Sequence, residues 1–537
     1  MKKPPPRLPA QASGSRRALL QSVLGLPGVS LWATRAHAGE ATERLPEYPF
    51  TLGVASGYPY PDGMVLWTRL APTPSAPGGG MPPSPVPVEF VVAKDEGLDQ
   101  VVTRGTVWAD PQWAHSVHAE PRGLSADTWY WYQFRVPGWS SPVGRTRTTP
   151  HNDAPIANMQ LRVGVACCQH YEVGYFTAYQ QMVADKPDLI LHLGDYIYEG
   201  TAGPSRVRTL TEPVAVSLED YRIRHAHYKQ DPDLQRAHAA CPWLVTWDDH
   251  EVDNDYMADQ SATGMPREWF LARRTAAYKA YYEHMPLPRW MMPFGPHMRL
   301  NKEFWFGSLA RVFMLDTRQY RDVTPCADNM RGGFEIGSPV DCDELLDPTR
   351  SMLGWQQRSW LLNRLQRETT PQWNLLAQQT LFQPAAIEIR DHMRVFPDGW
   401  DGYPGERDAI LNVLAKPAVK NPVVLSGDVH AFYANALAPA GDKTAASPVA
   451  TEFACGAITS GVPSPRFVNR VKATYPAVRF THVDKRGYLR LTINESTMKA
   501  DMIGVETVRT PNAKALTIAA FEVSSGQAGP QRLSPSR

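Results

Sequence analysis

Several short apolar segments of this chain lead directly into side chains that can bind metal ions or transfer protons. The residues that follow these segments are Cys167-Cys168, Asp195, Asp248-Asp249-His250, Asp316, and Asp428 with His430. Together they supply oxygen, nitrogen and sulfur donors for metal ions. A lone aspartate at a strand end is more often a helix cap than a ligand. Because the pattern recurs at segment after segment, we interpret these residues as parts of one metal site.

The acidic stretch at residues 248–255 has a simpler alternative, a solvated acidic loop. The apolar run at residues 243–245 leads straight into it, however, as a buried strand would lead into a site at its end. We therefore favour the site over the solvated loop.

The segments that carry these residues alternate with helical patterns from about residue 155 onward. We expect strands at residues 161–168, 188–194, 243–247, 311–315, 373–377 and 423–426. We expect helices at residues 175–184, 267–284 and 353–367. This alternation predicts an α/β layered domain. Loops that leave the carboxyl ends of parallel strands meet at one crevice, which is where the ligands would converge.

Residues 48–148 have a different sequence pattern, with short predicted strands separated by turn residues. Several strands alternate apolar and polar side chains, which predicts a β-sandwich. Leu124 followed by Tyr130, just inside an aromatic strand, looks like the tyrosine corner of fibronectin type III-like sandwiches. No catalytic residues stand out there, so we expect a structural or substrate-shaping role.

The motifs resemble those of known metallophosphoesterases. Gly194-Asp195 with Tyr198 looks like the Gly-Asp-x-x-Tyr motif of purple-acid-type enzymes, and Asp249-His250-Glu251 stands in the place of their Asn-His-Glu. A narrower resemblance is to the alkaline phosphatase D family, and it runs from about residue 48 to about residue 520. Its motifs here are residues 166–169, 192–199, 247–254, 315–318, 400–404 and 425–430. Cys167 departs from the family, which often has serine there.

The resemblance implies an iron–calcium site. By position, Fe3+ would be bound by Cys168, Asp195, Tyr198 and His430. Asp195 would bridge to a second site completed by Asp249 and Asp428, with Asn254 as a further candidate ligand. An all-oxygen second site favours Ca2+ over zinc, and the resemblance implies the same pairing.

Such a site predicts hydrolysis of phosphate esters. Two cations neutralise the phosphate and align its phosphorus for attack by a metal-activated hydroxide. The candidate catalytic residues are Asp195, Asp249 and His250, the last as a proton donor to the leaving group or a hydrogen-bond donor to the phosphoryl oxygens. Two alternatives remain for Cys168: a vicinal disulfide with Cys167, or a nucleophilic role.

Several other polar residues stay open between a site role and a structural one. Asp401 could be a carboxylate near the metals or a turn residue, and Asp316 and Arg318 could support the ligands or hold the phosphate. These three, together with the strand-end pair Gln378 and Gln379, complete the open set. Two further histidines, which we expect to be structural, are His170 and His192.

The N-terminus predicts export. Arg16-Arg17 precedes an apolar run at residues 18–32, and Ala36-His37-Ala38 follows. This order is typical of a signal peptide, and the twin arginine resembles a Tat signal read by the Tat export machinery. Pro27 interrupts the run, which is shorter than the roughly 20 residues of a membrane span, so we expect no stable membrane anchor. Cleavage after Ala38 would deliver a periplasmic or secreted protein.

The net charge and the cysteines indicate which partners and which disulfide bonds to expect. The formal net charge of +1 argues against a dedicated nucleic-acid partner. In an oxidising compartment, Cys326 and Cys342 would staple the polar loop between them. Cys241 and Cys455 lie in apolar contexts and are expected to be buried thiols.

The sequence therefore predicts four parts. They are a Tat-type signal peptide (1–38), a fibronectin type III-like all-β domain (45–150), an α/β metallophosphoesterase-type β-sandwich flanked by helices (155–520), and a disordered tail (521–537). The predicted activity is hydrolysis of small-molecule phosphate monoesters, extending to diesters, for phosphate scavenging. The alternatives are a phosphodiesterase or phospholipase D-like enzyme acting on lipid headgroups, and a non-enzymatic surface-binding protein.

Overall fold

A computed structural model describes residues 44–534, apart from residues 205, 327–341, 368–370, 390–391, 440 and 443. The expected signal peptide, residues 1–38, lies outside the described residues. Among the described helices, none combines the length and apolarity that a membrane span requires.

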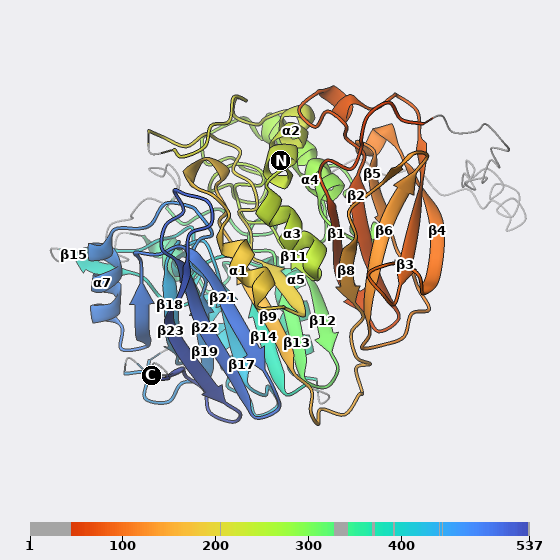
Figure 1. Ribbon diagram of the computed structural model, residues 1–537. Helices are drawn as coiled ribbons and strands as arrows, with labels where there is room; N and C mark the ends of the chain where they lie inside the picture. The colour runs from red at the N-terminus through yellow and green to blue at the C-terminus, as the bar shows by residue number, and fades with distance from the viewer. Residues whose placement is uncertain are drawn as a thin grey trace, which may run out of the picture. The chain divides into compact units, whose positions relative to one another are not determined.

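A ten-stranded sheet forms one layer of the protein (Figure 1). Three parallel strands lie at its centre: β9 (Leu161–Ala166), β10 (Leu189–His192) and β11 (Pro242–Val245). Beyond β9 the sheet continues antiparallel through β21 (Gly487–Ile493), β22 (Thr497–Val505), β23 (Ala515–Ser524) and β24 (Gln531–Arg532). Beyond β11 it continues through β1 (Val54–Tyr60), β2 (Gly63–Arg69) and β5 (Ser116–Ala119).

A seven-stranded sheet forms the second layer. In spatial order its strands are β12 (Lys302–Phe306), β13 (Ala310–Met314), β14 (Trp373–Ala377), β17 (Pro422–Ser426), β19 (Ala450–Ala454), β18 (Phe432–Leu437) and β20 (Val478–His482). Successive side chains along each of these strands point to opposite faces of the sheet. Leu375 and Leu425 join the core shared with the ten-stranded sheet, whereas Leu376 and Val424 join a core with two helices.

Helices cover the outer faces of the two sheets. They are α1 (Ala178–Ala184), α2 (Leu218–Lys229), α3 (Pro232–Ala240), α4 (Arg267–His284), α5 (Gly354–Leu365), α6 (Pro404–Leu414) and α7 (Pro465–Thr474). Residues of α5 and α6, such as Leu361 and Ile410, pack on the seven-stranded sheet. The predicted α/β layering is present, and α4 has the predicted bounds. The helices α2, α3, α6 and α7 were not predicted.

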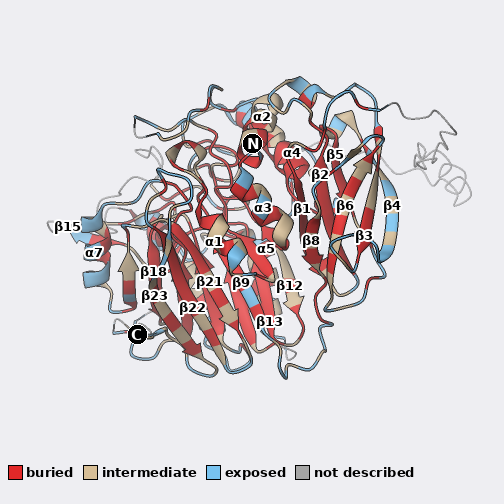
Figure 2. Ribbon diagram, in the orientation of Figure 1, coloured by how far each residue is buried: buried red, intermediate tan, exposed pale blue. Residues whose placement is uncertain are grey.

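The N-terminal strands form a second pair of layers. A smaller sheet runs β4 (Val101–Ala109), β3 (Val86–Ala93), β6 (Trp129–Val136) and β7 (Trp139–Ser140), with β8 (Gly144–Arg147) also on β6. Figure 2 shows β4 exposed at the outer edge and β1 buried. Val88 and Tyr132 pack against Val54 and Leu66 of the large sheet. The Tyr130 hydroxyl accepts a hydrogen bond from the Ser125 N–H at 2.9 Å, which links β6 to the segment before it.

The C-terminal residues correct one prediction. The expected disordered tail began at residue 521, but β23 continues to Ser524 and β24 pairs with it. Phe521 and Val523 alternate with polar residues and are buried in the core of the large sheet. The prediction was therefore wrong for residues 521–534, and residues 535–537 lie outside the described residues.

Candidate metal and phosphate site

Four predicted ligands lie directly after parallel strands, on backbone of unusual conformation. Cys168 follows β9, Asp195 follows β10, and Asp428 and His430 follow β17. Their φ angles are 56°, 55°, 58° and 52°, in the left-handed region of backbone conformation that residues other than glycine rarely adopt. Such conformations persist only where the surrounding structure enforces them, and they cluster at functional sites.

The first group of donors combines sulfur, nitrogen and oxygen. Ligand atoms of Cys168, Asp195 and His430 all lie within 4.8 Å of one another. The Tyr198 hydroxyl donates to Asp195 Oδ2 at 2.8 Å and lies 3.3 Å from His430 Nε2. Ser460 Oγ lies 2.7 Å from the same hydroxyl. The four residues predicted to bind iron are thus brought together.

A second group shares Asp195 with the first. Ligand atoms of Asp195, Asp249 and His250 also lie within 4.8 Å of one another. The other Asp249 oxygen, Oδ2, accepts the N–H of Asp255 at 2.6 Å. Asp428 lies close enough to Asp249 for the two negative charges to interact. A carboxylate that belongs to both groups is placed to bridge two cations.

The residues present fit a cation, because buried acceptors in both groups lack protein donors. Asp195 Oδ1 and Asp249 Oδ1 are buried, and within the described part of the chain neither has a hydrogen-bond partner. Burial, together with neighbouring carboxylates, raises the pKa of Asp195 well above its usual value, and burial raises the pKa of Asp428 to about 7. Crowded acidic groups of this kind need a positive charge, and a bound cation would supply it.

His250 is held beside these groups by an acidic partner. Its Nδ1 lies 2.7 Å from Glu199 Oε2, and Glu199 Oε1 accepts the Asn254 N–H at 2.9 Å. Burial alone would lower the pKa of His250, but the carboxylates of Glu199, Asp249 and Asp195 outweigh it and raise the pKa. The ring packs 4.1 Å from that of Tyr198, whose other face stacks on His170 at 4.2 Å.

Asn254, the further candidate ligand, bonds a neighbouring residue of the site. It is exposed, and its amide donates to Asp255 at 2.5 Å. Cys167 and Cys168 are both free thiols, so the vicinal disulfide is not present. Cys167 Sγ instead contacts the backbone carbonyls of Cys455 and Gly456, beneath the site.

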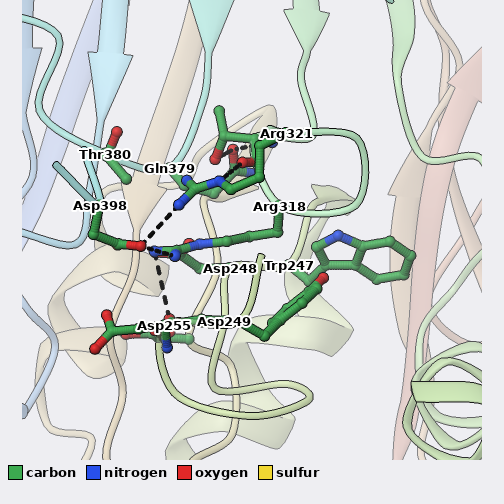
Figure 3. A network of polar contacts seen from close by, with 12 residues as sticks. Trp247, Asp248, Asp249, Asp255, Arg318, Arg321, Gln379, Thr380 and Asp398 are labelled. Carbon is green, nitrogen blue, oxygen red and sulfur yellow. Dashed lines mark hydrogen bonds and ion pairs between the residues drawn. The ribbon is translucent and has the colours of Figure 1, made fainter. Parts of the chain in front are cut away.

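Arg318 forms ion pairs with carboxylates beside the proposed ligands. Its guanidinium is fully buried and donates to Asp248 at 2.5 Å and to Asp398 at 2.7 Å, while Nη2 lies 3.8 Å from Asp249 Oδ1. Arg321 donates to the same Asp398 oxygen at 2.8 Å. Figure 3 shows both guanidinium groups directed at Asp398. Arg318 therefore binds carboxylates around the ligands.

The other open residues have local structural partners. Asp316 accepts the N–H groups of Arg318 and Gln319, and Asp401 accepts that of Ala385. Gln378 bonds Ser426 and Trp400, Gln379 bonds Thr317, and buried His192 faces the Gly194 N–H. His170 differs from the expectation in one respect, because it lines the pocket described next as well as stacking on Tyr198.

A pocket of about 660 Å³ opens over the donors. Its metal-facing side includes Tyr198, Asp255, Asp398, Asp428 and His430. The same lining includes apolar side chains, such as Phe396 from the loop after β16 (His392–Arg394) and Phe467 from α7, and the polar residues Gln383 and Asp401. β16 pairs with β15 (Ile387–Ile389) in a short hairpin. A small phosphate ester can therefore reach the donors from solvent.

Sequence reasoning missed several residues that hold this arrangement. Glu251 accepts the N–H groups of Asp195, Tyr196 and Asp248 at 3.2, 2.6 and 2.9 Å. Ser460 and Asp398 come from loops without periodicity, so no pattern marks them. Glu199 and Glu251 lie inside the quoted motifs and could have been found there by asking what orients each ligand.

Comparison with known proteins identifies the family. Residues 163–502 match the family described as PhoD-like phosphatase, and residues 34–150 match its N-terminal domain. The chain belongs to the PhoD-like phosphatase family. Alkaline phosphatase D of Bacillus subtilis (strain 168) is 42% identical over 535 residues, which cover 97% of this chain and 89% of that protein. A solved structure described as "Structure of PhoD" has a TM-score of 0.86 at 42% identity, covering 92% of this chain and 94% of that one.

Membership in the PhoD-like family confirms the resemblance inferred from the motifs, and it makes the chain a phosphatase. The two matched ranges together include both the N-terminal strands and the loops that carry the candidate ligands. The family does not by itself say which metal ions this chain binds or which esters it prefers.

Proposed function

We propose that this protein is an exported, metal-dependent phosphatase that hydrolyses phosphate monoesters at an iron–calcium centre. The observation that carries the proposal is the convergence of Cys168, Tyr198, His430 and two carboxylates around buried oxygens without protein donors. The open pocket beside them leaves room for an ester. A purely structural metal site would be closed by protein ligands.

The donor chemistry suits two different ions. Thiolate, phenolate and imidazole around Asp195 suit Fe3+, and the carboxylates of Asp195, Asp249 and Asp428 suit Ca2+. Asn254, whose amide bonds Asp255, is a further candidate ligand of the second ion. Bound there, the cations would neutralise the phosphate and lower the pKa of a water, so that hydroxide is available to attack phosphorus.

The chain's own residues then orient and transfer protons. Glu199 fixes the His250 ring through Nδ1, so the proton at that atom stays shared with a carboxylate. The rest of the ring lies beside Asp195 and Asp249, where it can hydrogen-bond phosphoryl oxygens or protonate the leaving alcohol. Arg318 and Glu251 hold the loops that present the carboxylates.

Metal analysis and an ester comparison test the proposal together. Purified protein should contain iron and calcium and be coloured, because phenolate or thiolate bound to Fe3+ absorbs visible light. It should hydrolyse p-nitrophenyl phosphate faster than its bis-ester or phosphatidylcholine. The reverse preference would identify the phosphodiesterase or phospholipase D-like alternative, and colourless, iron-free, active enzyme would overturn the iron assignment.

Replacing the bridging carboxylate tests the enzyme assignment itself. Asp195→Asn should lower kcat/KM for p-nitrophenyl phosphate by roughly 100-fold or more, because several kcal/mol of charge stabilisation depend on the cations. Asp347→Asn, in an exposed turn, is the matched control and should keep full activity. Retained turnover in Asp195→Asn would contradict the assignment of Asp195 as the carboxylate shared by the catalytic cations.

The proposal extends to location and to the N-terminal layers. We propose export by the Tat route through Arg16-Arg17, with cleavage after Ala38 and a periplasmic or secreted product. The hydrogen bond between Tyr130 and Ser125 supports a fibronectin type III-like sandwich in the N-terminal layers. Cys326 and Cys342 have Cα atoms 6.0 Å apart and sulfur atoms at bonding distance, which supports a disulfide after export.

A further inference from the structure

The pocket over the candidate metal ligands is lined by two chemically different kinds of side chain. Some are polar: carboxylates, the phenol and an imidazole of the site, and Gln383. The others, which make up its apolar side, are Leu381, Phe396, Val429, Val462 and Phe467. An ester bound with its phosphate at the ligands must place its remaining atoms in the rest of this pocket. The apolar side is therefore a surface that the leaving group can contact.

The apolar side is built into the fold. Phe396 and Phe467 come from different segments, yet their rings meet edge to face with centroids 4.7 Å apart. Phe467 and Val429 pack partly buried on a core cluster that includes Leu381 and Val468. A side chain supported in this way offers a fixed contact surface to a ligand.

Val429 joins this surface directly to the site. It lies between Asp428 and His430, two of the proposed ligands, and all three line the pocket. The residues on either side of Val429 have positive φ, which fixes how this segment of the loop turns. The apolar surface thus begins one residue from the metal-facing side chains, within reach of the first few carbons of a leaving group.

We propose, resting on the phosphatase activity proposed above, that Phe396, Val429 and Phe467 form a subsite for apolar leaving groups. The substrate class is phosphate monoesters whose alcohol carries an aliphatic chain or a ring next to the ester oxygen. Esters of small, strongly hydrated alcohols use the metal-facing side alone and gain nothing from this surface.

A homologous series of n-alkyl phosphates tests the subsite without changing the chemistry. Alcohols from ethanol to hexanol have nearly the same acidity, so differences in kcat/KM report contact with the chain rather than leaving-group reactivity. In the metal-loaded full chain, kcat/KM should rise roughly two- to fourfold per methylene, the range for partial to full burial. Binding of the matching n-alkylphosphonates, which are not hydrolysed, should strengthen in parallel when measured by calorimetry.

Two variants locate the surface. Phe467→Ala and Phe396→Ala should each flatten the dependence on chain length, in kcat/KM and in phosphonate affinity. Phe294→Ala is the matched control, because Phe294 is 87% exposed and does not line the pocket, and it should keep the wild-type slope. Thermal unfolding of each variant shows whether the fold is retained.

The outcomes separate this inference from the proposed function. Equal kcat/KM for ethyl and hexyl phosphate in the wild type would overturn the subsite while leaving the phosphatase intact. An unchanged slope in both pocket variants would overturn the assignment to these phenylalanines. No hydrolysis of any alkyl phosphate or of p-nitrophenyl phosphate would overturn the proposed function, and the subsite with it.

Discussion

Four of the proposed ligands adopt positive φ: Cys168, Asp195, Asp428 and His430. A non-glycine residue in this region costs about 1–3 kcal/mol, so the rest of the fold must hold it there. The Glu251 carboxylate does so for Asp195 by accepting three backbone N–H groups around it. At the residue scale, the conformation of Asp195 therefore depends on the carboxylate of Glu251.

Glu199→Gln tests such a holder for His250. The change keeps a hydrogen-bond acceptor of the same size but removes the charge that faces the Nδ1 proton. We expect kcat/KM for p-nitrophenyl phosphate to fall roughly 10- to 100-fold, as for other residues that orient an active-site group. The fall should appear mainly in kcat, because the carboxylates that would hold the phosphate-binding cations remain.

Glu212→Gln provides the matched control for this charge effect. Glu212 also pairs with a histidine, His227 at 3.2 Å, but it does not contact the site. Its removal should leave kcat/KM within about twofold of wild type, because partly exposed ion pairs contribute little. Equal losses in the two variants would argue that Glu199 acts only through general stability.

Most proposed ligands could be predicted because their signal is local. An apolar strand followed by Asp, His or Cys can be recognised from the sequence alone. In the structure Asp195 lies within one group of possible ligands with His430 and within another with Asp249. Side-chain direction has no such signal, so Asn254 was assigned from its position although its amide faces Asp255. Asp398 comes from a loop far along the chain, and only the folded structure brings it to Arg318.

At the scale of elements, one buried carboxylate joins the loop of Asp398 to the turn after β13. Asp398 binds both Arg318 and Arg321, which are fully buried. Asp398→Ala would leave two buried guanidinium groups without this partner. Breaking a buried pair in this way costs about 3–5 kcal/mol, so the thermal midpoint should fall clearly in a scan of the purified protein.

An exposed ion pair calibrates that measurement. Asp62 and Arg122 are 3.1 Å apart, with side chains 55% and 45% exposed. Asp62→Ala should change stability by no more than about 1 kcal/mol. An Asp398→Ala midpoint as close to wild type as that of Asp62→Ala would mean that water replaces the lost partner and that the network does not fix the loop.

The proposed disulfide between Cys326 and Cys342 would act at the same scale. A disulfide over a separation of 16 residues should add about 3 kcal/mol, because it restricts the unfolded chain. Replacing both cysteines by serine should lower the thermal midpoint of oxidised protein. Reduced wild type should melt like the double variant, and identical midpoints with and without dithiothreitol would contradict a bond between them.

At the scale of the whole molecule, the predicted boundary near residue 150 marks a change in the sequence pattern, from short strands to strands alternating with helices. It does not mark a break in the sheets. β1 pairs in parallel with β11, so strands from both sides of the boundary share one ten-stranded sheet. The sequence could not reveal this, because strand periodicity says which face is buried but not which distant strand is the neighbour. The same limit explains the tail, where buried Phe521 and Val523 needed a partner strand to be understood.

Metal removal should lower the stability of the whole fold, because the proposed ligands follow strands of both sheets. A ligand that binds only the folded state adds about 4 kcal/mol at 1,000 times its Kd. We expect chelator treatment to abolish turnover and lower the wild-type thermal midpoint, and returned iron and calcium to restore both. Asp195→Asn, which lacks the shared carboxylate, should lose most of this chelator response. A wild-type midpoint insensitive to chelator, or an equal shift in the variant, would show that these side chains do not bind the cations.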